Sequence, residues 1–313
     1  MTSRAQHRLG IACVTASAAA WSLGGLFTRL VSVDSWTMVA WRGLFGAASL
    51  AAVLLALRER ALWRRLRAMP PVGWLFVLQS ALGMICYLGA LRHTSVANVA
   101  VIYATAPFLA AALGWLLLRE RPARSAVAAS VAALIGVTVM VGTGSRGGWL
   151  GDLLAFGMTF SMAFATVAVR SFPQLPIPLT ACFSSLLSAL LAWPFGAPRA
   201  VSAHDLALLA LFGAINFGLG LPLFVMGARR LPAIESALIG ALDAPLAPLW
   251  VWLACNEVPA AGTLFGGALV FAAVGLHLYL GSGAARHEVA APAAFGAPPP
   301  PPATSAPSAV CRR

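Results

Sequence analysis

The sequence predicts an all-α integral membrane protein, and its composition and hydropathy carry that prediction. Apolar residues make up 60% of the 313 residues and charged residues only 10%, whereas about 25% of the residues in a soluble domain are charged. The mean hydropathy is +0.86. A water-soluble globule of this size cannot bury so much apolar surface, so a lipid bilayer must cover it.

Ten apolar runs are long enough to cross the hydrocarbon core of a bilayer, which takes about 20 helical residues. Each run is predicted to be a helix because an open strand would leave backbone groups unpaired in lipid. Short polar links, many with glycine or proline, separate the runs. The ten predicted helices cover residues 10–31, 36–57, 73–91, 95–118, 124–142, 150–169, 178–196, 205–227, 233–253 and 260–280.

The segments outside these runs set the orientation. Residues 1–9 are predicted to be an N-terminal arm, and residues 284–313 a disordered Pro/Ala-rich tail. All 21 basic residues are arginine; with the N-terminus inside, sixteen of them fall in cytoplasmic segments and four outside. The positive-inside rule therefore predicts that both termini are cytoplasmic. The net charge of +12 is assigned to topology and to contact with membrane lipid, not to nucleic acid.

The chain also repeats itself. Residues 90–108 align with residues 228–246 at an offset of 138, which pairs Pro107 with Pro245. The sequence therefore predicts two repeats of five helices each, residues 10–142 and 150–280. Because five is an odd number, the two repeats must be inverted with respect to each other in the membrane. Inverted repeats are typical of secondary carriers whose binding site lies near the midplane.

A Pro-to-Glu pattern lies at the fourth and ninth predicted helices, PFLAAALGWLLLRERP at 107–122 and PLAPLWVWLACNEVP at 245–259. Together with the ten spans and the 5+5 repeat, this pattern resembles the EamA-like members of the drug/metabolite transporter superfamily. The resemblance covers residues 10–280. The Pro-to-Glu spacing is 13 residues in the first half and 12 in the second. The resemblance implies a secondary carrier that moves small metabolites by alternating access, often outward.

Prolines within the spans are candidate hinges. Pro107, and Pro245 together with Pro248, are expected to break or bend the fourth and ninth helices in the membrane, because proline lacks the backbone N–H that a helix needs. The carbonyls freed in this way could bind solute, or the breaks could serve as hinges. A packing kink without a ligand role is the alternative.

Two charged residues within the spans are the leading candidates for the pathway. Asp243 lies at the centre of the ninth span, where a carboxylate costs about 2.5–3.5 kcal/mol on insertion scales; it is predicted to exchange protons, and the alternative is a structural carboxylate. Arg42 lies about two turns into the second span. It could hold an anionic group of the substrate or neutralise Asp243, or it could extend its side chain to the lipid headgroups.

Other polar residues within the spans are weaker candidates. Glu235 lies in the first turn of the ninth span, where it could serve the substrate or proton pathway, or only stabilise the helix dipole. Glu120 is predicted to form an interfacial salt bridge with the neighbouring arginines. Trp21 is a candidate for the cavity wall. The remaining candidates are Asn98, Tyr103, Ser161 and Asn216, of which some are expected to line the cavity or pathway and others only to join helices by hydrogen bonds.

Enzyme chemistry and cofactors are not expected. The sequence has no His/carboxylate metal pattern, no GxSxG nucleophile and no P-loop. The predicted function is proton-coupled efflux of amino-acid-like or amphipathic metabolites across the cytoplasmic (inner) membrane of a bacterium. An importer or facilitator of the same fold is the alternative, followed by a channel or membrane scaffold. A GxxxG pattern, GTLFG at 262–266, is compatible with a homodimer.

Overall fold

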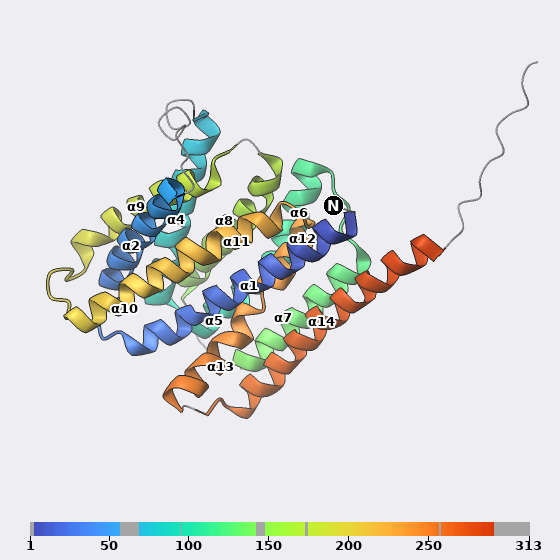
Figure 1. Cartoon of the computed structure of the whole chain (residues 1–313). Coiled ribbons are helices and arrows are strands. Elements are labelled where there is room, and N and C mark those ends of the chain that lie inside the picture. The colour runs from blue at the N-terminus through green and yellow to red at the C-terminus, as the bar shows by residue number, and fades with distance from the viewer. Residues whose placement is uncertain are drawn as a thin grey trace, which may run out of the picture.

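The computed structural model describes residues 3–56, 69–94, 96–141, 148–172, 175–256 and 258–290. Within these ranges all the regular elements are helices (Figure 1). By length and composition, nine helical segments of the described chain could cross a membrane. The third predicted span holds a shorter apolar segment, Pro71–Tyr87, so the described residues supply nine spans by this criterion where the sequence predicts ten.

Seven helices are continuous and three spans are interrupted. The interrupted spans are the fourth, eighth and ninth of the sequence prediction. The continuous helices are α1 (Ser3–Leu30), α2 (Ser35–Ala56), α4 (Pro71–His93), α7 (Arg124–Val141), α8 (Trp149–Ser171), α9 (Ile177–Ala192, followed by the short 3₁₀ turn Trp193–Phe195) and α14 (Ala261–Ala290). The interrupted spans are α5 (Val96–Tyr103) with α6 (Ala106–Leu118), α10 (Ala203–Gly213) with the π-helix η2 (Ala214–Gly220) and α11 (Leu221–Ala228), and α12 (Ala233–Gly240) with α13 (Asp243–Cys255).

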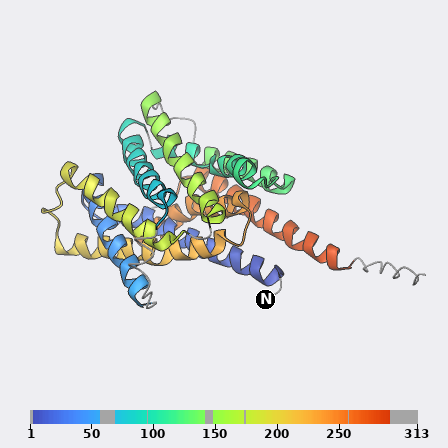
Figure 2. The same cartoon turned by 90° about the horizontal axis from the view of Figure 1, so that it is seen from above.

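Both ends of the chain are more helical than the sequence predicts. Helix α1 begins at Ser3, inside the predicted arm, and α14 continues to Ala290, through the first seven residues of the predicted tail. The reason is local: residues 284–290 are rich in alanine, arginine and glutamate, which favour helix, and the first proline comes only at Pro292. Figures 1 and 2 both show the last turns of α14 (red) extending beyond the neighbouring helices. The rest of the predicted tail, residues 291–313, lies outside the described residues.

The contacts between helices are reciprocal between the two halves of the chain. Helix α1 packs against α11 and α13, and its repeat equivalent α8 packs against α4 and α6. In the same way α2 packs against α10, and its equivalent α9 packs against α4. The pairs α2–α9 and α7–α14 join equivalent helices of the two halves, and α6 packs against α12 where the two broken spans meet. The contacts therefore relate the two repeats by an approximate two-fold symmetry.

The backbone repeats this symmetry in detail. Arg119, which ends α6, and Asn256, which ends α13, are 137 positions apart, and both adopt left-handed backbone with φ of 55° and 56°. Asparagine and glycine tolerate this conformation, whereas a long side chain such as arginine is strained in it. The second half therefore carries the favourable residue at this helix end and the first half does not.

Arg119→Asn is accordingly expected to stabilise the protein by about 0.5–1 kcal/mol, because it removes the strain of a side chain in left-handed backbone. The thermal unfolding midpoint of the detergent-solubilised protein measures the effect. Arg121→Asn is the matched control, since it removes an exposed arginine from the same link at a residue without positive φ. If the unfolding midpoint rose equally in both variants, the gain would come from the loss of a positive charge and not from relief of backbone strain.

The turn between α1 and α2 is closed by a carboxylate cap. The backbone N–H groups of Trp36 and Thr37 donate to Oδ1 of Asp34 at 2.9 and 3.0 Å, and the Thr37 hydroxyl donates to Oδ2. Burial alone would raise the pKa of Asp34, but these hydrogen bonds outweigh it and hold the pKa below its ordinary value. Thr37 also accepts a hydrogen bond from the backbone N–H of Ala197 at 2.7 Å, which ties the start of α2 to the segment after α9.

The GxxxG pattern of α14 is used inside the chain. The glycines Gly262 and Gly266 lie against the backbone of α7, and a Cβ added at either would meet backbone atoms of Val139, Gly136 or Met140. These small residues allow two helices to approach closely. The pattern therefore explains the α7–α14 contact, and the homodimer stays a prediction without its support.

Candidate functional site

Two broken helices meet at the centre of the bundle. The break between α5 and α6 falls at residues 104–105, and the break between α12 and α13 at residues 241–242. Pro107 has no N–H to donate to the carbonyl of Tyr103 four residues earlier, and Pro245 has none to donate to the carbonyl of Ala241. The two prolines therefore interrupt the helices where the sequence predicts it. Pro248 lies inside α13 without interrupting it, and the hinge role of all three prolines stays a prediction.

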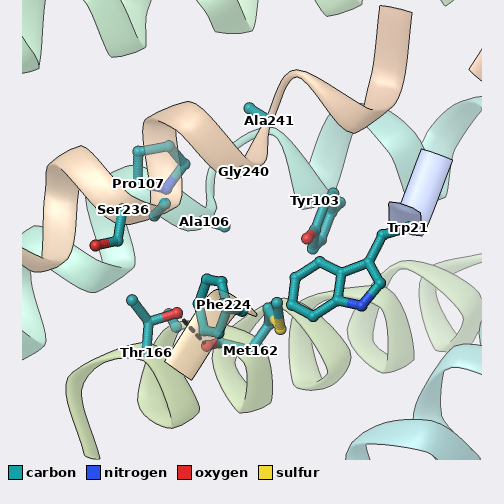
Figure 3. A pocket seen from close by; sticks show the side chains of 12 residues that line it. Trp21, Tyr103, Ala106, Pro107, Met162, Thr166, Phe224, Ser236, Gly240 and Ala241 are labelled. Atoms are coloured by element: carbon teal, nitrogen blue, oxygen red, sulfur yellow. Dashed lines mark hydrogen bonds between the residues drawn. The ribbon is translucent and has the colours of Figure 1, made fainter. Parts of the chain in front are cut away.

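A small cavity lies between these breaks (Figure 3). Its volume of about 20 Å³ is room for about one water molecule. Both broken spans contribute to its wall, and α1, α8 and α11 complete it. The lining residues include Trp21, Tyr103, Pro107, Met162, Phe224 and Ser236. The hydroxyl of Ser236 is buried and has no hydrogen-bond partner in the described structure, so the wall offers an unused polar group.

The aromatic wall of the cavity is held by the π-helix. The rings of Trp21 and Phe224 lie 5.0 Å apart between centroids. The indole N–H of Trp21 donates to the carbonyl of Asn216 at 3.1 Å, and the side chain of Asn216 donates to the carbonyl of Ala20 at 3.4 Å. Asn216 belongs to η2, and π-helical turns of this kind are frequent at functional sites. The predicted residue Trp21 thus lies in the wall, and Asn216 lies behind it.

Asp243 is the first residue of α13 and lies beside the second break. The backbone N–H of the next residue, Ala244, donates to the carbonyl of Ala241 at 3.3 Å. Its carboxylate interacts electrostatically with the phenols of Tyr103, which lines the cavity, and Tyr87 of α4. Both are hydrogen-bonding groups, and no ion pair of Asp243 is present in the described part of the chain. Asp243 does not itself line the cavity, but Ala241, two residues before it, does.

Arg42 lies apart from Asp243, and its guanidinium contacts a sulfur atom and two aromatic rings. Its Nη2 donates to the sulfur of Met84 at 3.2 Å, and its guanidinium carbon lies 5.3 Å from the ring centroid of Phe212 and 5.5 Å from that of Phe217. Its Nε is buried and has no hydrogen-bond partner in the described structure. The alternative in which Arg42 neutralises Asp243 is not realised, because no ion pair joins the two residues in the described part of the chain. A snorkelling role is also disfavoured, since the guanidinium is enclosed by aromatic rings.

Two predicted pathway residues connect helices and do not line the cavity. The hydroxyl of Ser161 accepts a hydrogen bond from the side chain of Gln79 at 2.5 Å, which joins α8 to α4. The amide of Asn98 donates to Asp152 at 2.7 Å and to Thr94 at 3.2 Å, where α4, α5 and α8 meet. These contacts indicate roles in helix packing for both residues.

Glu235 and Glu120 lie at the end of the bundle that holds the N-terminus. Glu235, in the first turn of α12, contacts His7 of α1 and His277 of α14. Glu120 pairs with Arg170 of α8, and not with the neighbouring arginines that the sequence suggests. Its repeat partner, Glu257, lies outside the described residues.

Sequence reasoning missed several residues of this site because their positions depend on tertiary contacts. Met162, Thr166, Phe224 and Ser236 reach the cavity from three different helices. One local signal was available for the π-helix: Pro222 follows it in the eighth span and cannot donate a helical hydrogen bond, which favours a wider turn before it.

These features define the class of the protein, a helical membrane protein of two repeats, each with one span broken by proline at a shared central cavity. The model of the EamA-like transporter family matches residues 8–142 and 149–279. The chain therefore belongs to the EamA-like transporter family, and the resemblance seen in its Pro-to-Glu pattern is confirmed.

A solved structure agrees with this fold. A chain from a structure described only as a crystal structure of a protein is 19% identical, with a TM-score of 0.72, over 88% of this chain and 98% of that chain. At that level of identity the likeness shows the fold alone. A comparison with curated proteins finds no match.

Proposed function

We propose that this chain is a secondary transporter that moves small amino-acid-like or amphipathic metabolites out of a bacterial cell across the cytoplasmic membrane, in exchange for protons. The observation that carries the proposal is the meeting of two broken helices, one from each family-matched repeat, at a single central cavity. Carriers built from inverted repeats bind their solutes between such discontinuous helices.

Alternating access gives a role to each part of this arrangement. The cavity has room for about one water molecule, so the described state is closed to a metabolite. A solute enters when the half-helices move apart, and the breaks at residues 104–105 and 241–242 can absorb the change in backbone angles. The aromatic wall of Trp21 and Phe224 suits an apolar part of the solute, and the free hydroxyl of Ser236 suits a polar part.

Asp243 is the proposed carrier of the coupled proton. A carboxyl group at this depth is more stable when it is neutral or compensated, and its neighbours Tyr87 and Tyr103 are neutral. Binding of a cationic or zwitterionic solute can therefore displace the proton from Asp243. The arginine distribution, sixteen to four, supports cytoplasmic termini.

The test uses purified protein in liposomes that contain a pH-sensitive dye, with a panel of amino acids and amphipathic cations. Wild type is expected to show solute-dependent proton flux, and Asp243→Asn is expected to lower that flux at least 100-fold, because the amide cannot exchange a proton. Asp34→Asn is the matched control: the chemical change is the same, and asparagine also caps a helix.

Three outcomes would change the assignment. Solute movement without proton flux, equal in wild type and Asp243→Asn, would identify a facilitator and return Asp243 to a structural role. Solute accumulation that follows the proton gradient inward would identify an importer. If no solute of the panel moved in any variant while the protein remained folded, a scaffold or channel would be favoured over a carrier.

A further inference from the structure

A second cavity lies at the end of the bundle that holds the N-terminus, and we call it the vestibule. Its volume is about 110 Å³, which is room for several water molecules. Glu235 lines it and contacts His7 of α1, so the vestibule lies at the N-terminal face of the bundle. The imidazole of His277, also in its wall, is 8% exposed, and its Nδ1 is buried without a hydrogen-bond partner in the described structure. The vestibule therefore offers an unused polar atom to a solute.

The vestibule and the central cavity lie along one seam, where α6 of the first repeat packs against α12 of the second. Both half-helices line the central cavity, with Ala106, Pro107, Ser236 and Gly240 (Figure 3). The next turn of each half-helix lines the vestibule, with Ala110, Ala111, Ala233 and Ile234. The seam therefore leads from the N-terminal face to the helix breaks at the centre of the bundle.

A buried apolar cluster separates the two cavities. Its members are Ala110, Ala163, Val167 and Ala233, and each is at most 2% exposed. Ala163 lines the central cavity, whereas Ala110 and Ala233 line the vestibule, so the cluster lies between them. None of these side chains carries a polar atom, and an apolar constriction of this kind excludes water and ions. The apolar cluster can therefore keep protons from leaking past a closed carrier.

We propose that the vestibule is the entrance to the central cavity from the N-terminal face and that the apolar cluster is the gate between them. Each half-helix of the seam adjoins a helix break, α6 at residues 104–105 and α12 at residues 241–242. The two half-helices can therefore separate by rotation at the breaks while α5 and α13 stay in place. Because three of the four gate side chains are alanines, few contacts are lost when the seam opens. The identity of the cargo rests on the proposed transport function; the opening of the gate does not.

The first test locks the seam with a disulfide. Gly114→Cys and Ala233→Cys are introduced together, because a Cβ at Gly114 would lie 3.6 Å from that of Ala233, a distance that a disulfide spans without strain. Gly240→Cys is the reporter, since Gly240 lines the central cavity and a Cβ there meets no atom within 4 Å. The native cysteines are replaced by alanine in this variant. A membrane-impermeant thiol reagent is applied to vesicles in which a tag shows the N-terminal face to be outside.

The disulfide is expected to lower the rate of labelling at Gly240→Cys from the N-terminal face roughly tenfold or more, because it removes the open state through which the reagent passes. Reduction of the disulfide, followed by removal of the reductant, should restore the rate. Labelling that is unchanged by the disulfide would overturn the proposal, and so would labelling that occurs only from the opposite face.

The matched control is a disulfide of similar geometry outside the seam. A Cβ at Gly157 of α8 would lie 3.8 Å from that of Cys86 of α4, so Gly157→Cys can pair with this native cysteine. Gly157 lies about 20 Å along α8 from Arg170, whose partner Glu120 lines the vestibule. This disulfide should leave the labelling rate unchanged. Equal slowing by both disulfides, or a seam disulfide that fails to form where the control forms, would overturn the proposal.

A second test needs no disulfide. Val167→Ala removes two methyl groups from the gate and is expected to raise the labelling rate at Gly240→Cys roughly fivefold, because the closed state loses packing that the open state does not have. Val169→Ala is the matched control and should leave the rate unchanged: Val169 is also buried on α8, at 2% exposed, but it packs in the main core instead of the gate. Equal labelling rates in the two variants would overturn the proposal.

None of these measurements uses a solute, so their outcome is separate from that of the liposome experiment. A gate that opens in a protein that moves no solute would leave the entrance standing and remove its role in transport. Solute transport that continues at the wild-type rate with the seam locked would leave the carrier standing and overturn the gate.

Discussion

Gly266→Val is expected to prevent α7 and α14 from packing and to destabilise the protein by at least ~3 kcal/mol, the upper part of the range for overpacked sites. A Cβ at Gly266 would overlap the backbone of Gly136 and Met140, and a Cβ at Gly136 would lie 2.8 Å from the carbonyl oxygen of Gly266. Backbone atoms cannot move aside as a flexible side chain can. The two helices must therefore separate along their whole contact.

The destabilisation by Gly266→Val should appear as a smaller monodisperse fraction in size-exclusion chromatography. The protein in that fraction should also have a lower unfolding temperature than wild type. Gly275→Ala, on the same helix, is the matched control, because a Cβ there meets no atom within 4 Å. It should change stability by less than about 1 kcal/mol, in the favourable direction of a better helix former. Normal yield and stability of Gly266→Val would show that α7 and α14 are not packed as described.

The parts of the fold that follow from backbone chemistry could be predicted from the sequence. Long apolar runs must be helices in lipid, and their bounds agree with the structure to within a few residues for most spans. The breaks at Pro107 and Pro245 were predictable for the same reason, since a missing N–H interrupts a helix wherever it falls. The repeat also extends to the helix ends, where Arg119 and Asn256 share left-handed backbone.

The site was harder to predict because it depends on contacts between distant residues. Tyr103, Ser161 and Asn98 are equal candidates in the sequence, because each is a polar residue within a span. Tyr103 lines the cavity, whereas Ser161 and Asn98 join helices by hydrogen bonds. For Glu235 the sequence suggests only a role in the pathway or the stabilisation of its own helix dipole. Its partner in α1, His7, is 228 positions away in the chain, and no local sequence pattern predicts that contact.

The same limit applies to charge pairing. Arg42 and Asp243 are the two charged residues deepest in the predicted spans, and an ion pair between them is the simplest expectation from the sequence. In the structure Arg42 instead contacts a sulfur atom and two aromatic rings, and Asp243 interacts electrostatically with the phenols of Tyr87 and Tyr103. Each charge is therefore left without a partner of opposite sign in the described state, which is the arrangement expected where the solute or proton supplies it.

Arg42→Gln is expected to lower the transport of carboxylate-bearing solutes at least 100-fold relative to the corresponding amides, which lack the negative charge, if the chain is the proposed carrier. The guanidinium is held between Phe212 and Phe217 while its Nε–H is buried and unused. A buried donor without an acceptor costs about 1–3 kcal/mol, and a carboxylate of the solute would recover that cost and add a charge-assisted bond. Stability should stay the same or rise in Arg42→Gln, because the variant removes an uncompensated buried charge.

The measurement compares each amino acid with its amide in liposomes, so that the two solutes differ only in the carboxylate. Arg42→Lys is the informative control: it keeps the positive charge but loses the planar group that stacks between two rings, and it should recover only part of the selectivity. A loss of stability in Arg42→Gln with unchanged selectivity between acid and amide would show that the guanidinium serves packing against the phenylalanines. Selectivity lost at full stability would show that the solute is the missing anion.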